Sequence, residues 1–359
     1  MNHDVLVRRG STLRFGSSPT RLPGSGAALV ELSFVGVCGT DLQILNGTRA
    51  DTAEVLGHEG AGTVVSAGKD CALQPGQSVV FNPAARLNEG RILGHNVPGI
   101  FQRLYLAEAA DVAGGVVLPV GQQAHGISSA LVEPLGVIVY AHELISRVTP
   151  DLRCAVVFGA GPVGLLAAIY LRALGIRVTM VHSSRARLGL AVQLGLIEPE
   201  AVLPIHDGQQ FDAALICTTR EGAPSALEHA AELVRDGGCI DFITNYPEQG
   251  TTPAGLSASA IRAVRAANVC GLPGDGEYLK ADLRGRRIAC TGHRGTSREH
   301  LLQAIRVLSQ HRRYESVITH RLSLHEAASA IQTLAMSHDR TLEGRDCIKA
   351  VIDMTRRSV

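Results

Sequence analysis

Hydrophobic and polar positions along the chain divide it into a β-rich part, a part in which strands and helices alternate, and a return to the first pattern. Early on, the apolar stretches Val5–Val7 and Ala28–Leu32 are separated by turns rich in Gly, Ser and Pro, which is typical of strands. A further strand is predicted at Val79–Phe81, whereas residues 82–100 have no clear period and are interpreted as a loop. A helix is predicted from Leu131 to near Arg147.

The alternating part begins after Thr149-Pro150-Asp151, which is a natural boundary. Strands are predicted at Cys154–Phe158, Val178–His182, Ala201–Leu203, Ala213–Cys217, Cys239–Ile243 and Arg287–Cys290. Helical patterns lie between most of these strands, notably at Ala223–Leu233. Six strands alternating with helices predict an α/β domain with a doubly wound parallel sheet.

After Thr291 the first pattern returns. Helices are predicted at Arg298–Ser309 and His325–Met336, and strands at Ile318–Leu324 and Ile348–Ile352. We therefore expect one domain made of residues 1–149 and 292–359, with a second domain, 150–291, inserted into it.

The segment Gly159-Ala160-Gly161-Pro162-Val163-Gly164 follows the buried strand 154–158 and precedes a helical run to Leu174. In this G-x-G-x-x-G spacing, the first Gly permits a tight turn and the second lets the backbone approach a pyrophosphate. The third lets helix and strand pack closely, and the helix N-terminus faces the phosphates. The strand–helix–strand context favours dinucleotide binding over an ordinary Gly-rich turn.

Composition narrows the functional classes. The chain has 359 residues, 45% hydrophobic and 19% charged, and a net charge of +1, which gives no electrostatic reason to expect nucleic acid or a membrane surface as partner. No apolar run is long enough to cross a bilayer. The eight cysteines are scattered without a C-x-x-C pair, so we expect reduced thiols and a cytoplasmic location.

Four residues of the first domain are candidate metal ligands: Cys38, His58, Glu59 and Glu133. A thiolate, an imidazole and carboxylates suit Zn²⁺. The residue types alone leave open a core thiol, a turn histidine and surface acids.

The motifs Gly36-Val37-Cys38-Gly39-Thr40-Asp41 and Gly57-His58-Glu59, followed by the glycine motif, resemble the zinc-dependent medium-chain dehydrogenase/reductase family over nearly the whole chain. The resemblance includes Pro75–Val79 and the segment Thr291–Gly295. It implies a GroES-like catalytic domain and a Rossmann domain. It further implies that Cys38 and His58 bind the catalytic zinc, with Glu59 a direct or exchangeable ligand. Thr40 would bond the substrate oxygen and pass on its proton, unless it is a simple turn residue.

Glu133-Pro134-Leu135 is similar to a motif of the polyol (sorbitol-like) branch, where Glu replaces the cysteine ligand of simple alcohol dehydrogenases. Alternatively, Glu133 is an acid favoured at a helix N-terminus.

Residues 82–100 lack the four cysteines of the family's structural zinc lobe, so we expect one zinc per chain. Gln43 stands where the family often has a proton-relay histidine, so another proton route is expected.

The second strand of the inserted domain ends in His182-Ser183-Ser184-Arg185, without the acid that would take the ribose hydroxyls of NAD. Ser183, Ser184 and Arg185 could instead hold a 2′-phosphate, which favours NADP(H) over NAD(H). Alternatively, Arg185 and Arg187 form a solvated helix face. Thr218 and Thr244 are expected to flank the nicotinamide, and Lys349 matches a family position that reaches the cofactor pyrophosphate.

Together these features predict a zinc-dependent, NADP(H)-preferring dehydrogenase acting on a secondary alcohol or ketone of a polyol, sugar or cyclitol. The alternatives are an amino-alcohol dehydrogenase of the threonine or aminocyclitol type, a zinc-free quinone or enoyl reductase, and a non-catalytic NADPH-binding protein. The intact candidate ligands argue against the zinc-free reductase. The expected partners are a small-molecule substrate and identical chains, in a homodimer or homotetramer.

Overall fold

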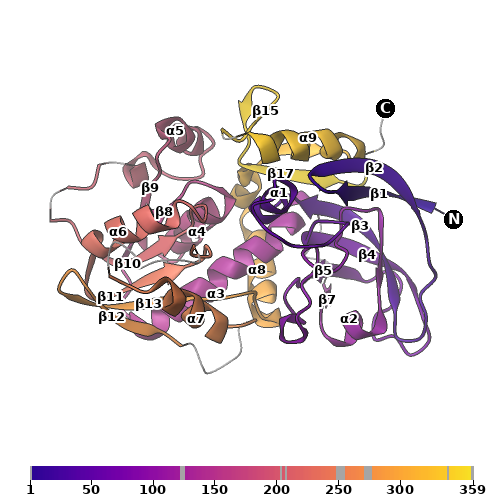
Figure 1. The fold of residues 1–359 in the computed structure, drawn as a ribbon, viewed down its shortest axis with the longest axis horizontal. Helices are drawn as coiled ribbons and strands as arrows, with labels where there is room; N and C mark the ends of the chain where they lie inside the picture. Colours follow the sequence, from indigo (N-terminus) through magenta and orange to yellow (C-terminus); the bar gives the residue numbers. More distant parts are fainter. Residues whose placement is uncertain are drawn as a thin grey trace. The chain divides into compact units, whose positions relative to one another are not determined.

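The computed structural model describes residues 2–121, 126–202, 204–206, 208–247, 255–270, 277–337 and 339–356. The chain forms two compact units, drawn in Figure 1. Unit 1 comprises Met1–Glu133 and Ser297–Val359, and unit 2 comprises Pro134–Thr296. Unit 2 is thus inserted in unit 1, while the domain boundaries at 149/150 and 291/292 remain predictions. Helix α3 (Val132–Val148) begins in unit 1 and continues in unit 2.

Unit 1 is built on a seven-stranded sheet in the order β14-β17-β3-β4-β5-β7, with β6 paired to β3. Its strands are β3 (Ala28–Gly36), β4 (Glu59–Ala67), β5 (Ser78–Phe81), β6 (Leu104–Ala107), β7 (Val117–Val120), β14 (Ile318–Leu322) and β17 (Lys349–Asp353). β17 comes from the end of the chain and pairs antiparallel with β3, Val351 facing Gly36. This pairing places the last strand beside the loop that follows β3.

Two hairpins and several helices complete unit 1. The hairpins are β1 (Asn2–Arg9) with β2 (Thr12–Pro19), and β15 (Thr341–Leu342) with β16 (Arg345–Asp346). The helices are α1 (Gly39–Leu45), α2 (Ala109–Ala113), α8 (Arg298–Gln310) and α9 (Leu324–Met336), with 3-10 turns at Leu87–Glu89, Ile127–Leu131 and Arg312–Val317. The core includes inward residues of the sheet and apolar residues of α9.

Unit 2 is built on a six-stranded sheet in the order β12-β13-β11-β10-β8-β9. Its strands are β8 (Cys154–Phe158), β9 (Arg177–Val181), β10 (Phe211–Ile216), β11 (Val234–Phe242), β12 (Leu279–Leu283) and β13 (Arg286–Gly292). Besides most of α3, unit 2 contains the helices α4 (Pro162–Ala173), α5 (Arg185–Gln193), α6 (Ala223–Leu233) and α7 (Ala258–Ala267). Every residue of β10 is buried, as expected of a central parallel strand covered on both faces. The predicted α/β class is therefore confirmed.

The strand predicted at Ala201–Leu203 is wrong. Residues Pro199–Val202 form a 3-10 turn beside β9, and Leu203 lies outside the described residues. The three apolar residues between Glu200 and Pro204 make too short a run to build a ladder along β9. The sixth strand of the sheet is instead β12, which pairs antiparallel with β13 at the opposite edge.

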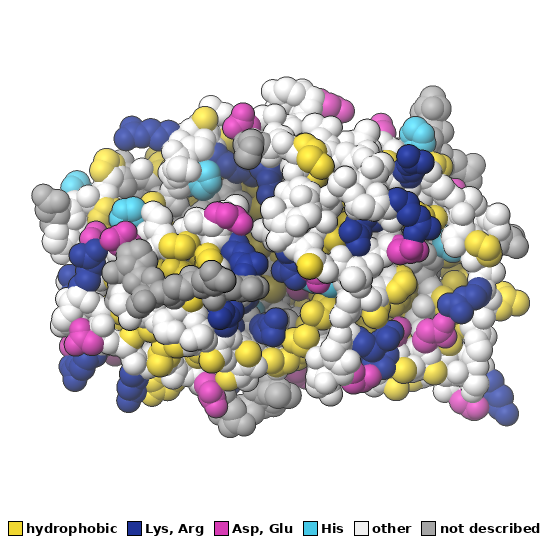
Figure 2. Space-filling model, in the orientation of Figure 1, with side chains coloured by type: hydrophobic (Ala, Val, Ile, Leu, Met, Phe, Trp, Pro, Cys, Tyr) yellow, Lys and Arg dark blue, Asp and Glu magenta, His cyan; other side chains and the backbone are white. Residues whose placement is uncertain are grey.

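The surface carries charges of both signs. Figure 2 shows basic and acidic side chains on the visible face, with hydrophobic side chains among them. None of the helices in the described ranges combines the length and the apolar character that crossing a bilayer requires.

Candidate active site

The loop after β3 places Cys38 at the N-cap of α1, where its thiol faces the backbone N–H of Thr40 at 3.5 Å. Asp41 completes a capping box, since its carboxylate accepts the Cys38 backbone N–H at 2.8 Å. The other oxygen of Asp41 accepts the backbone N–H of Gly57 at 3.1 Å. One fully buried carboxylate therefore joins the two loops that carry Cys38 and His58.

The turn before β4 depends on Gly57. Its φ is +87°, and a Cβ there would lie 2.3 Å from the ring of Phe101, so only glycine fits. The turn delivers His58 and Glu59 as consecutive residues, 4% and 2% exposed.

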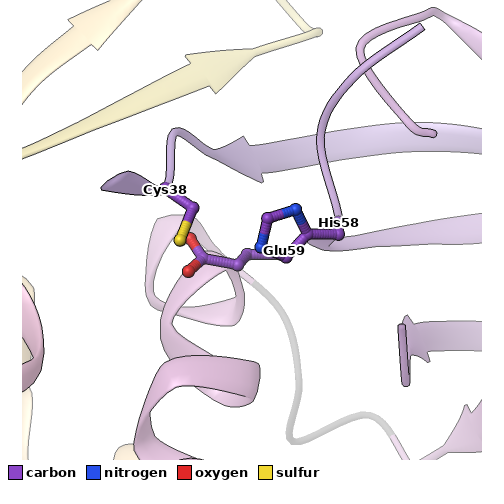
Figure 3. Close-up of side chains that lie close together, drawn as sticks. All are labelled: Cys38, His58 and Glu59. Carbon is purple, nitrogen blue, oxygen red and sulfur yellow. The ribbon is translucent and has the colours of Figure 1, made fainter. Parts of the chain in front are cut away.

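Cys38, His58 and Glu59 come together as the sequence predicts. One ligand atom from each lies within 4.8 Å of the others. Figure 3 shows the sulfur of Cys38 beside the carboxylate of Glu59, with the ring of His58 next to them. These residues come from two segments, the loop after β3 and the start of β4.

His58 is held between acidic and aromatic neighbours. Its Nδ1 lies 3.6 Å from the Asp41 carboxylate and has no hydrogen-bond partner among the residues that the structure describes. Its ring packs edge-on against His95, with centroids 4.9 Å apart. Burial alone would lower the pKa of His58, but the neighbouring Asp41 and Cys38 groups raise this pKa well above its usual value. The imidazole therefore lies in a strongly negative environment that attracts a cation.

Lys349, the first residue of β17, forms an ion pair through Nζ with Oε2 of Glu59. Both side chains are buried. Glu133 lies outside the group of three ligand atoms. Burial and the neighbouring Glu59 raise the pKa of Glu133 to about 7, although His58 and Lys349 act in the opposite direction.

The glycine motif forms the turn between β8 and α4. Gly159 has φ +110°, and a Cβ on Gly164 would lie 1.9 Å from the Gly159 carbonyl oxygen, so helix and strand pack closely. Gly161 is the N-cap of α4, and a Cβ there would meet nothing within 4 Å. The open space lies at a helix N-terminus begun by Pro162 and Val163, an arrangement that suits a phosphate.

The start of α5 matches only in part the alternative in which Arg185 and Arg187 form a solvated helix face. Ser184 caps α5 by accepting the Arg187 backbone N–H, and Arg185 is exposed at the first helical position. Arg187 is instead buried, and its Nε donates to the Ala160 carbonyl at 3.1 Å. Sequence reasoning missed this link between the two turns, because a single arginine on a helix has no pattern that reveals its partner.

The carboxyl ends of β10 and β11 bring Thr218 and Thr244 together. The Thr244 hydroxyl donates to the Thr218 carbonyl at 2.6 Å, and the Thr218 hydroxyl donates to the Thr219 carbonyl at 2.9 Å. Parallel strands present a ligand site at this end.

Comparisons with known proteins agree with this geometry. Residues 24–119 match the alcohol dehydrogenase GroES-like domain. The chain is 31% identical over 264 residues to glucose 1-dehydrogenase of Thermoproteus tenax, covering 67% of this chain and 74% of the relative. It is 31% identical over 245 residues to L-galactonate-5-dehydrogenase of Escherichia coli, covering 62% and 70%. It is 27% identical over 299 residues to human sorbitol dehydrogenase, covering 73% and 80%.

This chain belongs to the zinc-dependent medium-chain dehydrogenase/reductase family. The fold agrees with an alcohol dehydrogenase from Thermotoga maritima, with a TM-score of 0.71 at 20% identity over 98% of this chain and 99% of the other. The predicted GroES-like and Rossmann architecture is thus confirmed. As a member of this family of dehydrogenases, the chain is an NAD(P)-dependent alcohol dehydrogenase.

The ligand chemistry of this family member fits a zinc ion. The group offers a thiol sulfur, an imidazole and a carboxylate within 4.8 Å, which are common zinc ligands. Nδ1 of His58 is buried 3.6 Å from the Asp41 carboxylate, beyond hydrogen-bond distance, and this neighbouring negative charge favours a cation beside the imidazole. Asp41 was not assigned a role from the sequence. An acid three residues after a helix N-cap was the available signal.

Proposed function

We propose that this dehydrogenase interconverts a secondary alcohol and the matching ketone of a polyol, sugar or cyclitol, with NADP(H) preferred over NAD(H). The observation that carries the proposal is the meeting of Cys38, His58 and Glu59 within 4.8 Å. Relatives named for glucose, L-galactonate and sorbitol support the substrate class.

In this proposal Cys38 and His58 hold the catalytic zinc, and Glu59 and Glu133 supply carboxylate ligation. A zinc ion at this position polarises the substrate oxygen and stabilises the negative charge that develops on it. Asp41 holds together the two loops that carry Cys38 and His58, through the backbone N–H groups of Cys38 and Gly57. Thr40, in the first turn of α1, accepts the hydroxyl proton of the alcohol and passes it on. The onward route avoids Gln43, because a glutamine cannot relay a proton by titrating.

The cofactor assignment rests on unit 2. The turn Gly159–Gly164 receives the pyrophosphate at the N-terminus of α4. Ser183, Ser184 and Arg185 hold the 2′-phosphate, while Thr218 and Thr244 border the nicotinamide. A dehydrogenase from Sinorhizobium meliloti 1021, described as zinc-binding and bound to NADP, shares the fold with a TM-score of 0.72 at 19% identity over 98% of this chain and 99% of the other. Lys349 is proposed to bind the pyrophosphate as well. This role requires its amine either to leave the ion pair with Glu59 or to bind both groups at once.

We further propose one zinc per chain, a homodimer or homotetramer, and a cytoplasmic location. One zinc is proposed because residues 82–100 contain no cysteine to form a second site.

Zinc content and a substrate panel test the proposal together. Purified enzyme should hold one zinc per chain, and polyols or sugars should reduce NADP⁺ faster than amino alcohols such as threonine. Cys38→Ser should lose most zinc and most activity. Preferential oxidation of amino alcohols would move the enzyme to the alternative substrate class. Full zinc with no turnover of any alcohol or ketone would favour a non-catalytic NADPH-binding protein.

A further inference from the structure

The imidazole of His58 lies near the Asp41 carboxylate but does not bond to it. The distance from Nδ1 to the nearer oxygen is 3.6 Å, and this nitrogen has no hydrogen-bond partner within the ranges that the structure describes. A metal-binding histidine usually donates its second ring N–H to a carboxylate or a carbonyl, and this bond sets the direction of the metal-binding nitrogen. Another contact is therefore needed to hold the His58 ring.

The contact that the structure provides is the ring of His95. The two imidazoles pack edge-on, with centroids 4.9 Å apart and an angle of 63° between their planes, a favourable geometry for a pair of aromatic rings. His95 belongs to residues 82–100, whose sequence predicts only a loop. This loop therefore reaches the candidate metal centre.

The backbone of the loop packs directly on the turn before β4. A Cβ on Gly94, whose φ is +72°, would lie 2.5 Å from the Gly57 carbonyl oxygen, and a Cβ on Gly99 would lie 2.2 Å from the same oxygen. This oxygen also accepts the backbone N–H of Ile100 at 3.0 Å. The close approach, which depends on the two glycines, fixes the backbone on both sides of His95.

His95 is also held through its own atoms. Its carbonyl accepts the backbone N–H of Ala53 at 2.8 Å. Its Nδ1 lies 3.5 Å from Nη2 of Arg49 and 3.5 Å from Oδ1 of Asp51, and these two side chains form an ion pair at 2.8 Å. The His95 side chain is 13% exposed. The ring is thus restrained by contacts that do not involve the metal ligands.

We propose that His95 is a positioning residue of the metal centre, whose ring keeps the imidazole of His58 in the orientation that binds zinc. The role depends on ring packing and needs no charge on His95. A ligand that is already held in the binding orientation loses less conformational freedom when the metal binds. The inference rests on the proposed role of His58 as a zinc ligand, and it gives residues 82–100 a function at the catalytic site.

Zinc affinity, measured by competition with a chelator, tests this role. His95→Ala should weaken zinc binding by roughly 2–10-fold, the change expected when one aromatic pair is lost. His95→Phe keeps an aromatic ring without the nitrogens and should recover most of the affinity. The matched control is His142→Ala in α3, because His142 also packs edge-on against an aromatic ring, that of Tyr170, with centroids 5.7 Å apart. His142 belongs to unit 2, so this control should leave zinc affinity unchanged.

Cobalt substitution distinguishes positioning from a general loosening of the loop. The visible spectrum of bound Co²⁺ reports the geometry of its ligands, so His95→Ala should change the bands and His95→Phe should restore them. Wild-type zinc affinity and a wild-type cobalt spectrum in His95→Ala would overturn the inference. Weaker zinc binding with a wild-type cobalt spectrum and a lower unfolding midpoint of the apoprotein would assign His95 to loop stability, and would also overturn it. A His95→Phe variant as weak as His95→Ala would assign the effect to the ring nitrogens and refute the packing role.

Metal binding and turnover together separate this inference from the proposed reaction. Zinc affinity lost in His95→Ala and recovered in His95→Phe would support the positioning role even if the wild type oxidised no alcohol, while the missing turnover would refute the proposed function. Turnover of polyols or sugars, with equal metal binding in wild type and His95→Ala, would keep the function and refute the role of His95. Zinc that stays bound in Cys38→Ser would lie elsewhere and would overturn both.

Discussion

The ammonium of Lys349 and the carboxylate of Glu59 form a buried ion pair between residues 290 positions apart in the chain. The pair connects the first residue of β17 to the first residue of β4. The pair therefore ties β17 to a candidate zinc ligand. It also gives the buried Glu59 carboxylate, which lies near Glu133, a positive partner.

Replacing Lys349 with Met should destabilise the enzyme by about 3–5 kcal/mol, because removing one partner leaves the other charge buried and unpaired. Denaturant unfolding of the variant measures this loss. Arg345→Met is the matched control, since the ion pair of Arg345 with Glu343 is exposed, at 67% and 70%, and its removal should hardly change the unfolding midpoint. Equal midpoints for both variants would mean that the buried pair does not stabilise unit 1.

Gly36→Ala should weaken zinc binding without unfolding the protein. A Cβ at this position would lie 2.7 Å from Oε2 of Glu59 and 2.9 Å from Cε of Lys349, so the ion pair must shift. Gly39→Ala is the control three residues away, where a Cβ would meet nothing within 4 Å. Competition with a chelator should show reduced zinc affinity for Gly36→Ala alone. Similar affinities for the two variants would argue that the position of Glu59 does not matter to the metal.

Two arginines of α5 should have different effects on cofactor binding. Arg185→Ala should weaken NADP(H) by roughly 1.5–3 kcal/mol through loss of a charge-assisted contact, and NAD(H) should barely change. Arg187→Ala should weaken both cofactors, because Arg187 holds the Ala160 carbonyl in the glycine turn. Fluorescence titration gives the dissociation constants of both cofactors for the wild type and for each variant. A wild type that already prefers NAD(H) would contradict the assignment of Ser183 to Arg185.

Asp241, in β11, should make stability depend on pH near neutrality. One of its oxygens accepts the Thr291 hydroxyl at 2.8 Å, and the other is buried with no hydrogen-bond partner within the described part of the chain. Burial raises the pKa of Asp241 to about 7, although Thr291 and Arg265 act against it. A raised pKa means that the folded state prefers the protonated acid, so its contribution is complete below pH ~4 and is lost as pH rises through about 7.

Asp241→Asn imitates the protonated acid and should therefore be more stable than wild type at pH 8, by about 2–4 kcal/mol, with the difference shrinking at pH 5. Thermal midpoints at both pH values measure the effect. A variant whose advantage does not grow with pH would show that Asp241 is ionised in the folded protein throughout this range.

Sequence patterns predicted those parts of the molecule that depend on local periodicity. The strand Cys154–Phe158 and the helix Ala223–Leu233 have the predicted bounds, because each combines a strong apolar pattern with a clear end. The group Cys38, His58 and Glu59 was found through motifs whose order and spacing resemble a family.

Features that depend on distant contacts had no such signal. Asp41 joins two loops, Arg187 crosses to the neighbouring turn, and Lys349 meets Glu59 only because β17 pairs with β3. Antiparallel β12 was also missed, since its short mixed sequence resembles a loop until β13 pairs with it.

The last prediction concerns Glu133, which the sequence assigns as a ligand and which lies outside the group of three in the structure. If Glu133 ligates zinc, Glu133→Gln keeps the volume but offers a neutral, weaker oxygen donor, so zinc affinity and turnover should both fall. Glu133→Cys should retain some zinc, since thiolate is a good zinc ligand, but should turn over more slowly through a less electrophilic metal.

If Glu133 is only an acid in the first turn of α3, both variants should keep full zinc and lose no more than about 1 kcal/mol of stability. Zinc content and turnover, measured side by side, decide between the two roles. Because burial and Glu59 already raise the pKa of this carboxyl to about 7, its ionised form needs a nearby cation. Zinc binding by the wild type should therefore release a proton from Glu133 near pH 6, and this proton should be missing in Glu133→Gln. Identical proton release in the two proteins would show that Glu133 does not bind the metal.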